Sequence, residues 1–218
     1  MPGILLLGGT FDPPHAAHVE QAAAALRRGM PPGSWLVLVP AARSPFKKRA
    51  PGASDRDRVA MLRAAFAGVK RSTVWTDEID RARDATERAP SYWIDTLERL
   101  RSALPRESAP VLRFVIGSDQ AAEFHRWRRA REVIGLAEPL VVLRPPVRTA
   151  LGLRRAMASA GFWTEPELDA WEKRVVRCRL MDASATSVRE QVKTKPASAV
   201  GELPRRVAEY IERRGLYR

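Results

Sequence analysis

The sequence has few residues for covalent or metal cross-linking, with one cysteine and three histidines among 218 residues. Cys178 has no second thiol to pair with, so an internal disulfide is excluded, and nothing in the sequence points to a Cys-ligated metal site. Such sparing use of cysteine is typical of a reducing compartment, and we expect a cytoplasmic protein. No apolar run approaches the roughly 18 residues of a membrane span, so no membrane partner is expected. The short apolar run at Ile4–Leu7 follows no basic leader and predicts a strand rather than a signal peptide.

Several organising features are also absent. Neither a G-x-G-x-x-G fingerprint nor a Walker A motif follows the first apolar run. The chain has no low-complexity block, no internal repeat and no linker that separates two domains. Because 45% of its residues are hydrophobic and 29% are charged, we expect a packed globule with a single domain, residues 1–218.

Negative charge is comparatively scarce, since 25 acidic residues accompany 38 lysines and arginines, a formal net charge of +13. This excess favours polyanionic partners such as nucleotides, nucleic acid or acidic membranes. The basic residues are dispersed, apart from a cluster at Arg126, Arg128, Arg129 and Arg131. Aromatic residues do not interleave with them and no nucleic-acid module is recognisable, so we interpret the charge as a solvated surface and do not expect a nucleic-acid partner.

Apolar runs of strand length alternate with helix-length segments. Strands are predicted at Ile4–Leu7, Trp35–Val39, Ser72–Trp75, Val111–Ile116, Leu140–Leu143 and Val175–Met181. Helices are predicted at His15–Arg28, Ser54–Phe66, Ser91–Leu100, Ser187–Val192 and Pro204–Arg213. This order predicts an α/β fold: a Rossmann-like, mostly parallel sheet with helices on both faces and a small C-terminal helical portion. Pro146–Trp171 shows no clear period and is interpreted as an irregular or helical insertion.

The turn after the first strand, Gly8-Gly9-Thr10-Phe11-Asp12-Pro13-Pro14-His15-Ala16-Ala17-His18, is a candidate phosphate site. Two glycines let the backbone approach an anion closely, and the start of the next helix favours phosphate. His15 and His18 are three residues apart, so a helix presents both on one face. Their ring N–H groups can stabilise the charge that grows in phosphoryl transfer. Paired histidines also occur in zinc sites, but no carboxylate stands at a helpful spacing, and no metal site is predicted.

The segment GGTFDPPHAAH resembles the G-x-F-x-P-x-H-x-G-H signature of the nucleotidyltransferase superfamily related to class I aminoacyl-tRNA synthetases. Its GGTFDP-x-H form is similar to that of the nicotinate-nucleotide adenylyltransferases in particular. The resemblance implies that His15 and His18 bind the phosphates of ATP. It also implies ATP contacts for Gly8, Gly9, Thr10 and Phe11. Ala17 stands where the pattern has glycine, and the added methyl group would crowd the adenosine.

Two more segments are similar to parts of the same family that bind ATP. Pro45-Phe46-Lys47 resembles its Pro-x-Lys loop, which implies that Lys47 reaches the ATP phosphates. Ser184-Ala185-Thr186-Ser187-Val188-Arg189 resembles its Ser-x-Thr-x-x-Arg motif. Ser184 and Thr186 can cap a helix there and contact phosphate, and Arg189 offers a fork of donors to the β and γ phosphates.

Three segments resemble the family's acceptor-binding parts. Ser91-Tyr92-Trp93 is similar to a Ser-Tyr-Thr stretch that meets the nicotinate carboxylate, largely through backbone N–H groups, and Trp93 replaces the threonine. Ile116-Gly117-Ser118-Asp119 resembles an Ile-Gly-x-Asp turn, so Asp119 is predicted to accept hydrogen bonds from ribose hydroxyls of the nucleotides, ATP included. Phe124-His125-Arg126-Trp127 resembles a Phe-x-x-Trp stretch. Trp127 is thus a candidate for stacking on the pyridine ring, with a structural tryptophan as the other interpretation.

The resemblance implies an enzyme of NAD biosynthesis that transfers the adenylyl group of ATP to nicotinate mononucleotide, giving deamido-NAD and pyrophosphate. His15, His18, Lys47 and Arg189 are the expected catalytic residues, acting through positioning and charge stabilisation. Mg²⁺ is expected to arrive with ATP, held by phosphates and water more than by protein. Alternatives are transfer to nicotinamide mononucleotide or phosphopantetheine, a basic nucleic-acid-binding protein on the same fold, and an inactive nucleotide sensor. The sequence leaves the oligomeric state open, a homo-oligomer included.

Overall fold

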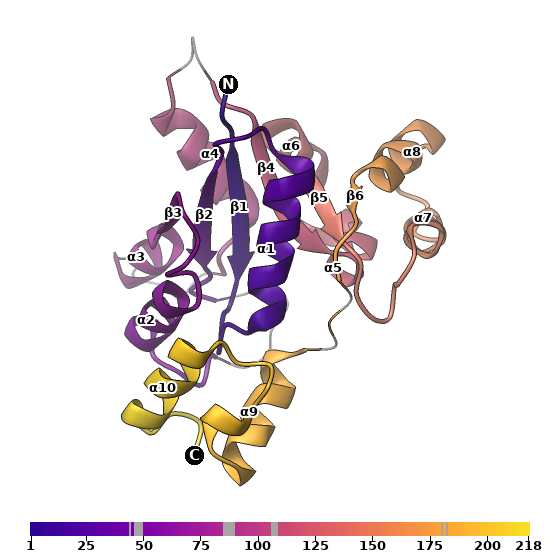
Figure 1. Ribbon diagram of the computed structural model, residues 1–218. Coiled ribbons are helices and arrows are strands. Elements are labelled where there is room, and N and C mark those ends of the chain that lie inside the picture. The colour runs from indigo at the N-terminus through magenta and orange to yellow at the C-terminus, as the bar shows by residue number, and fades with distance from the viewer. Residues whose placement is uncertain (44, 46–49, 85–89, 106–108, 180, 182) are drawn as a thin grey trace. The chain divides into compact units, whose positions relative to one another are not determined.

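The computed structural model describes residues 1–43, 45, 50–84, 90–105, 109–179, 181 and 183–218. Within these residues, six strands form one sheet in the order β3-β2-β1-β4-β5-β6 (Figure 1). The strands are β1 (Ile4–Gly9), β2 (Trp35–Pro40), β3 (Ser72–Val74), β4 (Leu112–Gly117), β5 (Glu138–Val142) and β6 (Val175–Val176). β1 pairs with β4, β4 with β5, β5 with β6 and β2 with β3, each time in parallel. The predicted parallel α/β sheet is confirmed.

Helices alternate with these strands along the chain. The α-helices are α1 (Ala16–Gly29), α2 (Asp55–Ala65), α3 (Asp77–Asp84), α4 (Trp93–Ala103), α5 (Ser118–Ala122), α6 (Ala130–Leu136), α7 (Ala150–Ala158), α8 (Glu165–Lys173), α9 (Ala185–Thr194) and α10 (Arg205–Arg214). Two short 3₁₀ helices are η1 (Phe124–Arg126) and η2 (Ala197–Ala199). None of the helices described is both long and apolar enough to cross a membrane.

The chain divides into two compact units, and each is treated by itself. The first unit comprises Met1–Leu7, Gln21–Trp35 and Trp93–Asp182. The second unit comprises Gly8–Glu20, Leu36–Tyr92 and Ala183–Arg218. The expectation of one domain over residues 1–218 stays a prediction.

In the first unit, helices cover both faces of the sheet. Phe114 of β4 meets Trp93 at the start of α4 edge-on, with ring centroids 5.8 Å apart. The next residue, Val115, is in register with Leu140 of β5, and a Cβ added at Gly29, the last residue of α1, would touch the Leu140 side chain. Successive side chains of a strand point to opposite faces, so α4 and α1 lie on opposite faces. This confirms the predicted arrangement of helices on both faces.

In the second unit, the C-terminal helices pack against α2 and form the predicted small helical portion. Their shared core consists of buried aliphatic residues: Ala53, Met61, Val188, Val192, Ala197, Val200, Leu203, Val207, Ala208 and Ile211. At its edge, the buried carboxylate of Asp57 accepts hydrogen bonds from the Tyr210 hydroxyl (2.9 Å) and from Arg214 Nε (3.2 Å). The Ser54 hydroxyl, which also caps α2, lowers the pKa of Asp57, so this carboxylate stays ionised as an anchor for α10.

Several predicted boundaries are wrong. Of the described residues in the strand predicted at Val175–Met181, only Val175 and Val176 form a strand, β6, paired with β5. Pro146–Trp171 contains α7 and most of α8, so the helical interpretation of this insertion is right. Thr149 caps α7 by accepting a hydrogen bond from the Gly152 backbone N–H. The predicted helix start at Ser91 is also wrong, since α4 begins at Trp93.

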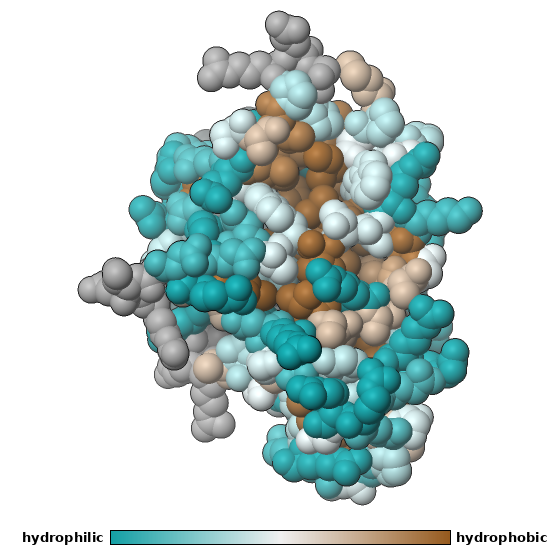
Figure 2. Space-filling view, turned by 90° about the vertical axis from the view of Figure 1, so that its left-hand side faces the viewer, coloured by the Kyte–Doolittle hydropathy of each residue, from teal (hydrophilic) through white to brown (hydrophobic). Residues whose placement is uncertain are grey.

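The surface is largely hydrophilic on the face that Figure 2 shows, with one apolar area in the upper half of that view. Exposed large apolar side chains of the described residues are Met1, Trp35, Val111 and Leu151. Apolar residues otherwise fill the interior, where most residues of β2, β4 and β5 and the central residues of β1 are buried. A strand buried on both faces reads as a continuous apolar run, which is why these strands were predictable.

Candidate active site

The turn after β1 carries the two histidines to the start of α1. The backbone N–H of His15 donates to Nδ1 of His18 (3.1 Å), and the two rings stack with centroids 3.8 Å apart. His18 is the third helical residue, so its ring supplies the acceptor that Glu or Gln supplies in a capping box. A ring nitrogen that accepts carries no proton, so the neutral His18 ring holds its proton on Nε2. His18 therefore presents an N–H donor at a helix N-terminus, where an anion is favoured.

Phe11 shapes this turn from the inside. Its backbone has φ of 50°, an uncommon left-handed conformation, and its side chain is buried. The ring meets His18 edge-on at 5.1 Å, and a Cβ added at Gly9 would lie 3.1 Å from its Cζ. Glycine at position 9 thus makes room for the ring that supports His18. The structure places Phe11 behind the histidine pair as packing, whereas its predicted ATP contact stays a prediction.

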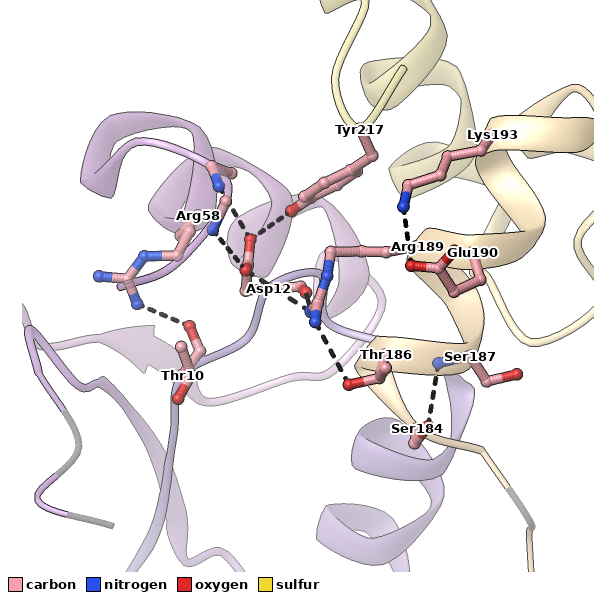
Figure 3. Close-up of polar contacts among 12 residues, drawn as sticks. Thr10, Asp12, Arg58, Ser184, Thr186, Ser187, Arg189, Glu190, Lys193 and Tyr217 are labelled. Atoms are coloured by element: carbon pink, nitrogen blue, oxygen red, sulfur yellow. Dashed lines mark hydrogen bonds and ion pairs between the residues drawn. The ribbon is translucent and has the colours of Figure 1, made fainter. Parts of the chain in front are cut away.

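Asp12 ties the turn to distant parts of the second unit (Figure 3). Its carboxylate is 5% exposed and accepts hydrogen bonds from the backbone N–H of Gly52 (2.7 Å) and Ala53 (3.0 Å). The Tyr217 hydroxyl donates a third bond to the same carboxylate (2.7 Å). Burial raises the pKa of Tyr217, and the Asp12 carboxylate raises it further, so the hydroxyl remains a donor well into the alkaline range.

Arg189 lies against the same turn. Its Nη1 donates to the backbone carbonyl of Asp12 (2.6 Å) and lies 3.6 Å from the Asp12 carboxylate, while Nη2 donates to the Thr186 hydroxyl (3.2 Å). Ser184 caps α9 by accepting from the Ser187 backbone N–H (3.1 Å). The structure therefore brings Arg189, with Thr186 bonded to it, to Asp12 in the turn between β1 and α1, and Ser184 stands nearby in the chain at the cap of α9 (Figure 3). Arg189 keeps 30% of its side chain exposed.

Arg58 supports the turn from α2, and the sequence did not single it out. The side chain is fully buried and donates from Nη1 to the Thr10 carbonyl (2.6 Å) and from Nη2 to Asp55 (2.6 Å). The guanidinium thus fixes the backbone at Thr10. The α2 sequence DRDRVAMLRAA gives no signal of this role for Arg58, since arginine is common on a solvated helix face.

In the first unit, Asp119 follows β4 as predicted, but its carboxylate is held by Arg144. Nε of Arg144 donates to one carboxylate oxygen and Nη2 to the other (2.8 Å). Ser118 braces the arginine, because its hydroxyl accepts from the Arg144 backbone N–H (2.9 Å) and donates to the Val147 carbonyl (2.6 Å). A carboxylate has further lone pairs, so the predicted ribose contact of Asp119 is compatible with this pair and stays a prediction.

The two candidate acceptor tryptophans belong to an aromatic cluster in the first unit. Trp127 stacks on Phe124 with ring centroids 4.6 Å apart and lies 6.5 Å from Phe114. Trp93 contacts Phe114 from the start of α4. Both tryptophan rings therefore pack against other aromatic side chains. For Trp127, the ring face that contacts Phe124 thus has a structural role. Its predicted stacking on a pyridine ring stays a prediction.

Comparison with known proteins agrees with these features. The Cytidylyltransferase-like family model matches residues 6–191. A relative from Gloeobacter violaceus named probable nicotinate-nucleotide adenylyltransferase is 36% identical, covering 97% of this chain and 94% of its own. Another of that name from Bordetella petrii is 34% identical over the whole of both chains. This chain belongs to the nicotinate-nucleotide adenylyltransferase family.

Solved structures share the fold of this nicotinate-nucleotide adenylyltransferase family chain. The nicotinic acid mononucleotide adenylyltransferase of Plasmodium falciparum, complexed with APC, matches with a TM-score of 0.63. The match covers 100% of this chain and 98% of that one, at 13% identity. The same enzyme complexed with NaAD gives the same TM-score at 14% identity. At sequence identities this low, the structural similarity supports the fold and nothing further.

Not all predicted residues of the adenylyltransferase site can be placed. Lys47 lies outside the described residues. Ser91 donates its backbone N–H to the Arg43 carbonyl (3.0 Å), and Tyr92 directly precedes α4. Among the residues that the structure describes, no group of three or more His, Cys, Asp and Glu side chains is placed to hold a metal ion.

Sequence reasoning missed Arg144, although one signal could have found it. Arg144 follows β5 just as Asp119 follows β4, and the two strands are adjacent and parallel. Residues after the carboxyl ends of adjacent parallel strands share one edge of the sheet. An arginine and an aspartate at those positions predict an ion pair, once the strand order is known.

Replacing Gly117 by alanine is expected to disrupt this ion pair in the adenylyltransferase. The added Cβ would lie 2.7 Å from Cζ of Arg144 and 2.6 Å from Oδ1 of Asp119, so both side chains must move. Because both side chains are part-exposed and can swing aside, we expect a loss of up to about 1 kcal/mol in the free energy of unfolding, measured by urea denaturation.

Gly135→Ala is the matched control, because no atom lies within 4 Å of its added Cβ in α6. There alanine should stabilise by roughly 0.5–1 kcal/mol, since glycine is a poor helix former. Equal stabilities for the two variants would show that Gly117 is not required by the Arg144–Asp119 pair.

Proposed function

We propose that this chain transfers the adenylyl group of ATP to the 5′-phosphate of nicotinate mononucleotide. A phosphate oxygen of the mononucleotide attacks the α-phosphorus of ATP, the bond from that phosphorus to the bridging oxygen of the β-phosphate breaks, and pyrophosphate leaves. The products are deamido-NAD and pyrophosphate. No covalent enzyme intermediate is needed, so the protein contributes positioning and charge stabilisation.

One observation carries the proposal: Arg189 from α9 is bonded to the turn that presents His15 and His18 at the start of α1. Arg189 supplies positive charge, and the two histidines supply N–H donors, beside the same stretch of backbone. A bound triphosphate requires both. Membership of the nicotinate-nucleotide adenylyltransferase family adds the identity of the acceptor.

In this proposal His18 donates from Nε2 to an oxygen near the α-phosphorus, where negative charge increases during transfer. The hydrogen bond from the His15 backbone to Nδ1 supports that role, since it keeps the donor proton on Nε2. Arg189 is steered by Asp12 and Thr186 and offers its fork to the leaving pyrophosphate. Lys47 is proposed to join it from the loop after β2.

We also propose that Mg²⁺ enters with ATP and is held by phosphate oxygens and water. The nearest carboxylate of the turn, Asp12, is buried and already accepts three hydrogen bonds from the protein, which leaves no room beside it for a hydrated ion. The bound ion would neutralise charge on the triphosphate, as hard cations that keep several waters commonly do.

A substrate panel tests the proposal. Purified protein, ATP and Mg²⁺ are combined with nicotinate mononucleotide, nicotinamide mononucleotide or phosphopantetheine, and pyrophosphate release is followed by a coupled assay. We expect the nicotinate nucleotide to give the highest kcat/KM, by about tenfold or more, because a recognised carboxylate makes charge-assisted hydrogen bonds that an amide cannot.

Each other outcome has a definite meaning. Turnover of nicotinamide mononucleotide alone would make the proposed acceptor wrong while keeping adenylyl transfer. Pyrophosphate release with none of the three acceptors, from a folded protein, would remove the proposed reaction. Omitting Mg²⁺ and adding a chelator should abolish release with every acceptor.

A further inference from the structure

The first unit contains a cavity of about 390 Å³ that no step of the proposed reaction uses. It is lined by the last residues of α1 and α8, by the first residues of β4 and β5, and by β6. The lining residues are Arg28, Gly29, Arg113, Glu138, Leu140, Lys173, Arg174, Val175, Val176 and Arg177. This set is called the basic cavity below.

The basic cavity is separated from the residues that follow the strands. Arg113 and Glu138 stand in register near the starts of β4 and β5, whereas Asp119 and Arg144 follow the ends of the same strands. Gly117 lies four positions beyond Arg113, which is about 13 Å of extended chain. A ligand in the basic cavity would therefore occupy a different place from a nucleotide bound beside Asp119.

The charges of the basic cavity are unbalanced. Glu138 is its one carboxylate, and two of the five cations already share it: Arg113 Nε lies 2.7 Å from Oε2 and Arg174 Nε lies 3.6 Å from Oε1. Arg113 also donates to the Gly29 carbonyl at the end of α1, and the Arg174 guanidinium lies 5.4 Å from the Trp171 ring. These contacts hold both arginines in place.

The remaining cations are uncompensated. The side chains of Arg28, Lys173 and Arg177 make no hydrogen bond or ion pair within the described part of the chain, and all three residues are exposed. Arg28 and Lys173 stand in the last turns of α1 and α8, where cations favour the helix dipole. The helix dipole does not account for Arg177, because this residue follows β6. Without a bound anion, the cations of the basic cavity repel one another.

The volume and the lining residues of the basic cavity indicate which class of ligand it can bind. A volume of about 390 Å³ lies within the range of small-molecule sites. The cations suit a chain of phosphates, for which arginine forks are well shaped. Leu140 and Val176 lie on one face of the sheet, since Val176 is in register with Val142, and they add a small aliphatic area that a ring can contact. We propose that the basic cavity binds a nucleoside di- or triphosphate, as a second nucleotide site apart from the proposed reaction.

Calorimetric titration with GTP tests this second site. The variant Arg28→Glu/Arg177→Glu reverses two exposed charges of the cavity. The control Arg205→Glu/Arg206→Glu reverses two exposed charges in the first turn of α10, outside the cavity, with the same change in net charge. Both are made in a His18→Glu background, which places a negative charge at the proposed ATP phosphate site.

We expect the control to bind about one GTP per chain, and the cavity variant to bind it at least about tenfold more weakly. Arg28→Glu/Arg177→Glu with His18 restored should keep wild-type adenylyl transfer when GTP is omitted. Equal GTP affinities of the cavity variant and the control would overturn the proposal, and so would a control that binds no GTP up to about millimolar concentration. Melting temperatures of all variants establish that each is folded.

Discussion

Replacing His18 by alanine or by glutamate is expected to reduce adenylyl transfer by about 10²–10³-fold, which is the usual effect of removing one donor from a growing negative charge. The two variants separate the roles of this side chain. Alanine removes both the donor and the acceptor for the His15 backbone N–H. Glutamate at the third helical position restores the acceptor and favours the helix dipole.

His18→Glu should therefore melt at or above the temperature of His18→Ala, while its turnover is as low or lower. The measurement is kcat by pyrophosphate release, together with thermal melting of each protein. His125→Ala is the control, because His125 lies in η1, near Phe162, and has no proposed role. Near-normal turnover in a folded His18→Ala protein would remove His18 from the mechanism.

Replacing Asp12 by alanine is expected to lower the free energy of unfolding by about 3–5 kcal/mol. The substitution removes a buried carboxylate and leaves three donors without their acceptor: the backbone N–H of Ala53, which is buried, and the backbone N–H of Gly52 and the Tyr217 hydroxyl, whose bonds are part-buried. Domains are stable by only about 5–15 kcal/mol, so this is a large fraction of the total. Urea denaturation measures it.

Two further variants calibrate this loss. Tyr217→Phe removes one of the three bonds to Asp12 and should cost about 1 kcal/mol. Asp169→Ala removes an aspartate whose side chain is 58% exposed and paired with Arg154, so its effect should stay below about 1 kcal/mol. If Asp12→Ala unfolded at the same urea concentration as Asp169→Ala, the buried carboxylate would not hold the turn together.

The fold could be predicted wherever apolar pattern and burial agree. β1, β2 and β4 were placed to within about two residues, because each is a continuous apolar run buried in the sheet. α3 was missed, since its sequence DEIDRARD has one large apolar residue, Ile79, and no helical stripe. β6 was overestimated because Arg177 and Arg179 alternate with other residues, a pattern that suggests a strand, whereas neither arginine pairs with a strand among the described residues.

The candidate site was predictable where its residues are close together in the chain. The i,i+3 spacing of His15 and His18 at a helix start fixes their proximity without any tertiary contact. Asp12 could not be identified in this way, because its partners lie 40, 41 and 205 residues further along. Arg189 reached the site through its motif, since a contact spanning 177 residues has no local signal.

The hydrogen bond between Asp12 and Tyr217 determines when, during synthesis of the chain, the turn after β1 can be completed. Residues 12 and 217 are separated by 205 positions, so a ribosome adding about 5–20 residues per second needs some 10–40 s to deliver the second partner after the first. During that interval the glycine turn has emerged without the hydroxyl that completes its anchor. In a nascent chain the turn after β1 therefore gains its complete anchor only after Tyr217 has been added.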